Sequence, residues 1–111
     1  MICKTFSFSR IEKTPAIIEK DINDFLKENT LKYVIQNESA VKGKVIITIF
    51  AEEKPGKIKA KVFKDQNYKS IDKNVNEFLE NNSMKFVTQT FIGSNIYTII
   101  FFSEKKEVDE Q

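Results

Sequence analysis

The side chains that most often do chemistry in proteins are scarce in this sequence. It contains no histidine, which removes the commonest general base and metal ligand. The single cysteine, Cys3, has neither a histidine to activate it nor a second cysteine for an intrachain disulfide. No phosphate-binding loop, dinucleotide-binding glycine pattern or nucleophile elbow occurs, and the chain has only three glycines. The sequence therefore predicts a protein that is not an enzyme and holds no metal or cofactor.

The carboxylates are numerous, but they do not suggest a catalytic pair. Most fall on two segments with helical periodicity, and lysines are interleaved with them. Such a pattern is typical of solvated helix faces with local charge pairing. These carboxylates are Glu19, Asp21, Asp24, Glu28, Asp72, Glu77 and Glu80.

A binding surface for an anionic ligand is the remaining chemical possibility. Lys59 and Lys61 follow Lys57 in alternation with apolar residues, so they either protect an edge strand or face an anion. Arg10 is the only arginine and offers the only guanidinium for a phosphate or carboxylate. Phe91 and Tyr97, near expected loops, either stack on a base or pack in the core. The candidate ligand-binding residues are Arg10, Lys59, Lys61, Phe91 and Tyr97.

The elements that must position these residues come from a chain that repeats itself. Ile18–Gln36 and Ile71–Gln89 are identical at nine of nineteen positions, with an offset of 53 residues. In each copy, apolar residues at i, i+4, i+7 and i+8 predict a helix. The expected N-cap of the first helix is Thr14, followed by Pro15 at the first helical position, and that of the second helix is Ser70. We expect the helices to end near Asn29 and Asn81–Asn82, where asparagine tolerates a left-handed cap.

Three strands are expected around each helix, so that each repeat is a β-α-β-β unit. The expected strands are Ile2–Ser9, Lys32–Asn37 and Val45–Phe50, then Lys57–Lys64, Lys85–Phe91 and Ile96–Phe102. We predict an α+β fold in which the tandem repeats form an antiparallel-rich six-stranded sheet with two helices on one face. Residues 1–54 and 55–106 would form one compact pseudo-dimeric domain, and residues 107–111 a flexible tail.

The linker EEKPGK leaves the pairing of the first strands open. Pro55–Gly56 suits a type II turn, which would join Val45–Phe50 to Ile58–Phe63 as a hairpin. A right-handed crossover, however, gives the third strand of each unit two neighbours within that unit. Either the first strands are exchanged between the repeats, or the linker turns without pairing its flanks. We favour the exchange, because so short a linker leaves little slack.

Both faces of the third strands are apolar, and two helices can cover only one face of a six-stranded sheet. A broad exposed apolar sheet is unusual in a soluble monomer. The other face therefore requires a second copy of the chain, a ligand pocket between subunits, or a different protein. We expect a homo-oligomer.

Charge and hydropathy exclude several classes of protein. The formal net charge is only +2 and nearly all basic residues are lysines, which argues against a nucleic-acid binder. No apolar run approaches the ~18 residues of a membrane-spanning helix. The first residues, MICKTFSFSR, lack the apolar centre of a secretory signal. We expect a cytoplasmic protein.

The unit KVF…SIDKNVNEFLENN…KFVTQT…NIYTIIFFSEKK resembles a small βαββ protein family of bacilli and their phages, one member of which is expressed during sporulation. The resemblance covers Lys57–Lys106 closely and Lys4–Lys54 more loosely, and it implies a fold without an activity. In type, the chain is also similar to the phage sponge proteins of the anti-Thoeris and anti-CBASS classes, which trap nucleotide immune signals without catalysis.

We therefore expect a non-enzymatic small-ligand-binding protein, of a phage-type sponge kind, that sequesters an anionic nucleotide immune signal in a bacterial host cell. The alternative is a protein–protein interaction or scaffold module that uses its spare sheet face or edge.

Overall fold

The computed structural model describes residues 1–8, 14–39, 44–92 and 94–105, so Arg10 and the expected tail 107–111 lie outside the described residues. In this part of the chain the order of elements is β-α-β-β twice, which confirms the α+β fold of tandem repeats. The elements are β1 (Ile2–Phe8), α1 (Pro15–Glu28), β2 (Thr30–Ser39), β3 (Lys44–Glu52), β4 (Lys59–Asp65), α2 (Tyr68–Leu79), β5 (Asn82–Ile92) and β6 (Asn95–Glu104).

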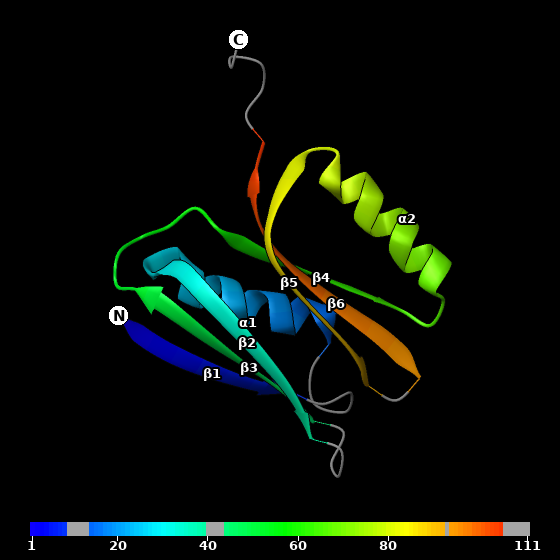
Figure 1. Ribbon diagram of the computed structural model, residues 1–111, viewed down its shortest axis with the longest axis horizontal. Helices are drawn as coiled ribbons and strands as arrows, with labels where there is room; N and C mark the ends of the chain where they lie inside the picture. Colours follow the sequence, from blue (N-terminus) through cyan, green and yellow to red (C-terminus); the bar gives the residue numbers. More distant parts are fainter. Residues whose placement is uncertain (9–13, 40–43, 93, 106–111) are drawn as a thin grey trace.

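The strands form two separate three-stranded sheets, in the orders β1-β3-β2 and β4-β6-β5 (Figure 1). Every pairing is antiparallel, and each third strand lies between the other two strands of its own repeat. The expectation of one six-stranded sheet is therefore wrong. The favoured exchange of first strands is also wrong, because β1 pairs with β3 and β4 pairs with β6.

The linker explains why the repeats do not exchange strands. The hydroxyl of Thr30 lies 2.9 and 3.1 Å from the carbonyl oxygens of Lys54 and Pro55 and can donate to either. Gly56 packs so closely that a Cβ there would lie 2.8 Å from Oγ1 of Thr30. These contacts hold the linker at the start of β2, and the chain then enters β4 without pairing it with β3.

The helix N-termini follow local capping chemistry. The hydroxyl of Thr14 accepts from the backbone N–H of Ile17 (3.3 Å), and Pro15 is the first residue of α1, as expected. In the second repeat, Asn67 accepts from the backbone N–H of Lys69 (2.7 Å). The predicted cap at Ser70 is therefore wrong, because Asn67, an equally good capping residue, lies three residues earlier and starts α2 one turn sooner.

The helix C-termini use asparagine differently from the expectation. The predicted end of α1 near Asn29 is confirmed, but Asn29 is extended (φ −139°) rather than left-handed. Its side-chain amide donates to the carbonyl of Phe25 (2.9 Å), and Asn82 donates in the same way to Phe78 (2.8 Å). Asn29 and Asn82 are equivalent in the repeat, so each helix ends by satisfying a free carbonyl with a side chain.

The strand pairings define which residues of the two sheets are equivalent. Phe50 pairs with Tyr33 and Phe101 with Phe86, so β3 and β6 correspond with an offset of 51 residues. By the same reasoning Cys3, opposite Phe50, corresponds to Ala60, opposite Phe101. Each sheet thus has a helix face and a back face. In the first sheet the helix face carries Val45, Ile47, Ile49 and Ala51, and the back face carries Cys3, Thr5, Tyr33, Ile35, Ile46, Thr48 and Phe50.

Different faces of the two repeats meet in the main hydrophobic core. This core joins the helix face of the first sheet to the back face of the second sheet, with α1 beside them. Its buried members are Phe8, Ile18, Ile22, Leu26, Leu31, Val45, Ile47, Ile49, Ala51, Ala60, Val62, Tyr97, Ile99 and Phe101. In a pseudo-dimer with two-fold symmetry the same surface of each half would meet. The repeats are instead packed head to tail.

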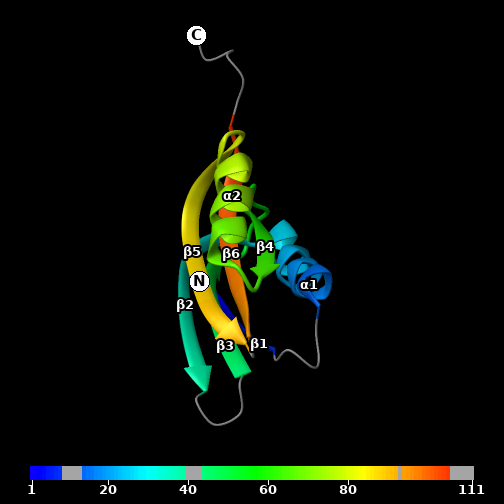
Figure 2. The same cartoon turned by 90° about the vertical axis from the view of Figure 1, so that its right-hand side faces the viewer.

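A smaller cluster joins the helix face of the second sheet to α2. It consists of Phe63, Ile71, Ile96, Ile100 and Phe102, with Val75 and Phe78 packed against them. The two helices therefore cover different surfaces, and Figure 2 shows α1 on the far side of the sheets from β2 and β5. The back face of the first sheet is the one sheet face that no described element covers.

β2 and β5 run side by side where the two sheets meet (Figure 1). The rings of Tyr33 and Phe86 are 6.2 Å apart in an edge-to-face arrangement, and the amide nitrogen of Gln36 donates to the carbonyl of Gln89 (2.9 Å). Both contacts join residues 53 positions apart, so the two strands run in the same direction.

Helix α1 closes the opposite side of the core by binding the edge of β4. The side chain of Asn23 accepts from the backbone N–H of Ala60 (2.7 Å) and donates to its carbonyl (3.0 Å). The carboxylate of Glu19 accepts from the backbone N–H of Val62 (2.8 Å). Side chains of α1 thus take the place of a neighbouring strand, which protects this edge.

We predict that Asn23→Ala destabilises the protein, because it leaves the N–H and C=O of Ala60 without partners at a part-buried edge. The expected loss is about 1–3 kcal/mol in the free energy of unfolding, measured by urea denaturation. The matched control is Asn76→Ala, since Asn76 is the equivalent residue of the second repeat and is exposed. Equal losses for the two variants would contradict the edge-binding role.

Candidate functional site

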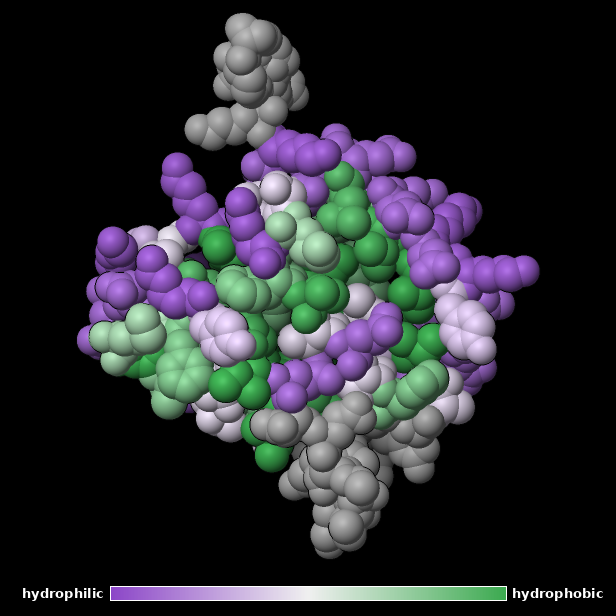
Figure 3. Space-filling model, in the orientation of Figure 1, coloured by the Kyte–Doolittle hydropathy of each residue, from purple (hydrophilic) through white to green (hydrophobic). Residues whose placement is uncertain are grey.

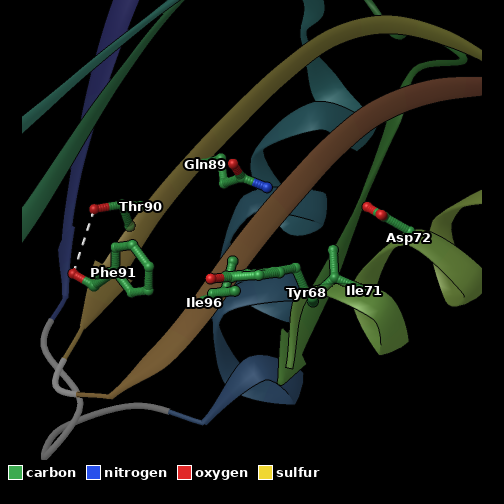
Figure 4. A pocket seen from close by; sticks show the side chains of 7 residues that line it. All are labelled: Tyr68, Ile71, Asp72, Gln89, Thr90, Phe91 and Ile96. Atoms are coloured by element: carbon green, nitrogen blue, oxygen red, sulfur yellow. Dashed lines mark hydrogen bonds between the residues drawn. The ribbon is translucent and has the colours of Figure 1, made fainter. Parts of the chain in front are cut away.

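A cavity of about 450 Å³ lies between the start of α2 and the adjoining ends of β5 and β6. Its lining residues come from all three elements, as Figure 4 shows, and they are Tyr68, Ile71, Asp72, Gln89, Thr90, Phe91 and Ile96. The volume falls within the range of small-ligand pockets, roughly 300–1,000 Å³.

Two exposed aromatic rings border the cavity. Tyr68 is 71% exposed and Phe91 is 64% exposed, although both side chains are large and apolar in part. In Figure 4 the Tyr68 side chain extends from α2 toward Ile96 and Phe91. Ile71 and Ile96 are buried and belong to the cluster beneath α2. The cavity therefore offers an apolar floor between two rings that have little packing of their own.

Polar groups surround this apolar floor. The amide nitrogen of Gln89 donates to Oγ1 of Thr98 (2.9 Å), which fixes the orientation of the amide. Asp72 contributes a carboxylate from the first turns of α2 and is the one charged side chain among the described lining residues. Rings for stacking and oxygens that accept hydrogen bonds suit a planar ligand that carries N–H groups.

A second, more open hollow of about 550 Å³ adjoins the first and shares Tyr68 with it. Gln66, Asn67 and Lys69 complete its lining. Two of the backbone N–H groups here are already used: Asn67 donates to Asp65 (3.1 Å), and Lys69 donates to the side chain of Asn67 (2.7 Å). The Lys69 side chain adds a full positive charge for a ligand at this place.

The structure brings one of the five sequence-predicted residues, Phe91, to the cavity. Lys59 lies 3.8 Å from Glu104 in an exposed pair, and Lys61 lies 3.7 Å from Glu19 in a half-buried one. An exposed pair such as Lys59–Glu104 contributes little to stability. Both lysines are on β4, each beside a carboxylate of β6 or α1, and neither of them lines the cavity or the adjoining hollow. Arg10 lies outside the described residues.

Tyr97 needs a correction. Its side chain is only 2% exposed, and its ring lies 6.5 Å from the ring of Phe8 in the main core. The ammonium group of Lys64 lies 5.7 Å from the centre of the same ring. Tyr97 faces the first sheet because of its odd position on β6, so core packing and not ligand contact accounts for it.

Tyr68 is the site residue that sequence reasoning missed, and the repeat contains the signal that could have revealed it. With the offset of 53 residues, Tyr68 replaces Pro15 and Phe91 replaces Glu38. The two rings of the cavity thus occur where the second repeat departs from the first and gains an aromatic side chain. A difference between repeats marks this site better than their similarity does.

The local pairing that the spacing predicted is seen for Asp24, whereas Glu19 binds β4 instead. Lys20 donates to Asp24 (2.8 Å) one turn further along α1, and this hydrogen bond raises the pKa of Lys20 and lowers the pKa of Asp24. Among the described residues, no group of three or more cysteine or acidic side chains could hold a metal ion. Neither α1 nor α2, the helices of the described segments, is long and apolar enough to cross a membrane.

In comparisons with known proteins, no protein-family model matches the chain, and no curated protein and no solved structure is significantly similar to it.

We predict that two aromatic truncations on neighbouring strands differ sharply in their effect on stability. Phe91→Ala removes an exposed ring and should change the free energy of unfolding by less than about 0.5 kcal/mol. Tyr97→Ala removes a buried ring and should cost roughly 3–5 kcal/mol. Thermal or urea unfolding of both variants measures the difference, and a large loss for Phe91→Ala would show that its ring is structural.

Proposed function

We propose that the protein is a non-enzymatic small-ligand-binding protein that takes up the planar ring of a nucleotide-like molecule between Tyr68 and Phe91. The observation that carries this proposal is the cavity of about 450 Å³ bordered by two strongly exposed rings. An exposed aromatic side chain gives up contact with water when a flat ring stacks on it. Stacking of a base on an aromatic side chain contributes about 1–3 kcal/mol per base.

The polar lining favours a nucleobase over a purely apolar ring. The Asp72 carboxylate and the fixed amide of Gln89 stand beside the rings, where they can meet the N–H groups of a base edge. A hydrogen-bonding site of this kind discriminates strongly against ligands that lack the matching group. The ligand class is therefore one with a flat heterocycle and exocyclic N–H donors.

The charge around the cavity restricts where an anionic group of the ligand lies. Asp72 would repel a phosphate held in the first cavity, whereas Lys69 lines the adjoining hollow on the other side of Tyr68. We place the phosphate in that hollow, with Tyr68 between it and Phe91. A protein that holds such a ligand without converting it acts by sequestration, as a sponge for a nucleotide immune signal does.

The test is a thermal unfolding assay with a panel of cyclic mononucleotides, cyclic dinucleotides and ADP-ribose-type nucleotides. A ligand at about 100 times its dissociation constant stabilises the folded state by about 2.7 kcal/mol, which raises the melting temperature by several degrees. Tyr68→Ala and Phe91→Ala should each weaken this shift, because each removes one stacking surface.

Met84→Ala is the matched control, since Met84 is an exposed apolar residue of β5 outside the cavity lining. No stabilisation by any member of the panel would reject the nucleotide class. A shift that persists in both ring variants would move the binding site away from this cavity. Native mass spectrometry of the protein as purified would show whether a ligand of a few hundred daltons stays bound.

A further inference from the structure

Two exposed apolar surfaces remain outside the cavity. The first is the back face of the first sheet, where Tyr33, Ile35 and Ile46 are exposed. The second, here called the β5 strip, consists of Met84 and Val87 on the helix face of the second sheet. In Figure 3 the hydrophobic residues gather over the middle of the view, where β2, β3 and β5 lie in Figure 1. Apolar side chains gathered in this way mark an interaction surface.

The back face of the first sheet corresponds to a surface that is buried inside the chain. In the second sheet the equivalent positions form half of the main core. Ile46 corresponds to Tyr97, Thr5 to Val62, Cys3 to Ala60 and Phe50 to Phe101. In the second repeat, then, a surface of this kind already lies against the helix face of a βαββ unit.

The β5 strip corresponds to the other half of the same internal contact. Met84 is equivalent to Leu31, which is buried in the main core, and Val87 is equivalent to Val34, which packs against that core. Both members of the strip are 49% exposed. The second sheet thus exposes, beside α2, the rim of the surface that in the first sheet receives a partner, and α2 covers the remainder.

The residues of α1 that bind the edge of β4 also have unused counterparts. Glu19 and Asn23 correspond to Asp72 and Asn76 of α2, and both of these are exposed. The edge that they would bind corresponds to β1, which within the described residues pairs with β3 alone. The back face, the β5 strip and these two residues of α2 therefore repeat parts of the internal contact on the surface, whereas the counterparts of Val45, Ile49 and Ala51 lie buried beneath α2.

We propose that copies of this chain associate head to tail, with the back face of the first sheet of one copy on the β5 strip and α2 of the next. The contact reproduces between chains the one that joins the two repeats within a chain. When two different surfaces of identical chains bind each other, further copies can add and form a ring or a filament. When the same surface of each copy binds, association stops at a dimer.

A second copy fits these surfaces better than an unrelated protein does, because the chain itself supplies both matching halves. The centre of the back face carries apolar residues, hydroxyl groups and one thiol, so no charge opposes the contact there, and the strand register places the carboxylate of Glu52 at the end of this face. Three strands spaced by ~4.8 Å, with about seven residues each, cover roughly 300 Å². Stable complexes bury about 800 Å² per partner, so the association should be weak and depend on concentration.

Helix α2 covers the surface that would receive the next copy, so it must move outward. Helix α1 shows the position it would take, because α1 lies against the edge of the second sheet. The packing of the two helices favours this movement in α2. Only Ile71 of α2 is buried, whereas α1 buries Ile18, Ile22 and Leu26.

Sedimentation velocity from micromolar to near-millimolar protein tests the proposal. The wild-type chain should form species that grow with concentration. Ile35→Lys, on the back face, and Val87→Lys, on the β5 strip, should each weaken association about tenfold or more, because each places a charge in an apolar contact. Ile17→Lys is the matched control, since Ile17 is 45% exposed on α1 and belongs to neither surface.

Mixing the two variants gives the decisive result. Each variant retains one intact surface, so an equimolar mixture of Ile35→Lys and Val87→Lys should form heterodimers and nothing larger. Circular dichroism confirms that both variants are folded. The proposal is overturned if the wild-type chain is monomeric at every concentration, or if Val87→Lys associates like the wild type, which would indicate a symmetric contact between back faces. Because neither residue lines the cavity, failure here is distinct from failure of ligand binding.

Discussion

The contact between the helix face of the first sheet and the back face of the second sheet is the interaction on which the rest of the structure depends. A β-α-β-β unit of this size is only marginally stable alone, and a core shared by two such units adds the buried surface that a single unit lacks. Because different faces meet, the repeats occupy different environments. Ile47 and Ile99 are both buried in this core, whereas Thr48, the counterpart of Ile99, lies on the uncovered back face.

Much of the fold could be predicted from the sequence because it depends on local chemistry. The apolar stripe from Ile18 to Leu26, the cap at Thr14 and the β-branched run of β3 each determine their element with few distant contacts. The relation between the sheets could not be predicted. Strand β6 needs two apolar faces in the middle of one long sheet, and it needs them equally between a helix and another sheet. Its apolar composition therefore does not distinguish the two arrangements.

The candidate site was predictable only in part, for a related reason. Phe91 follows a polar stretch of β5, and its position near a loop indicated exposure. Tyr97 has the same proximity to a loop, but the side of β6 on which it lies is decided by strand register and by the sheet behind it. The role of Tyr68 depends on the exact start of α2, and the sequence offers two equally good caps, of which Asn67 is used rather than Ser70.

The head-to-tail packing also explains why the residues of the first repeat that are equivalent to the cavity lining have a different role. In the first repeat the second sheet covers the helix face, Ile18 and Val45 are in the core, and Glu19 is bound to the edge of β4. In the second repeat the equivalent Ile71, Ile96 and Asp72 line the cavity instead. The proposed ligand site and the proposed head-to-tail contact both use Asp72, so the two proposals together predict that ligand uptake and association compete.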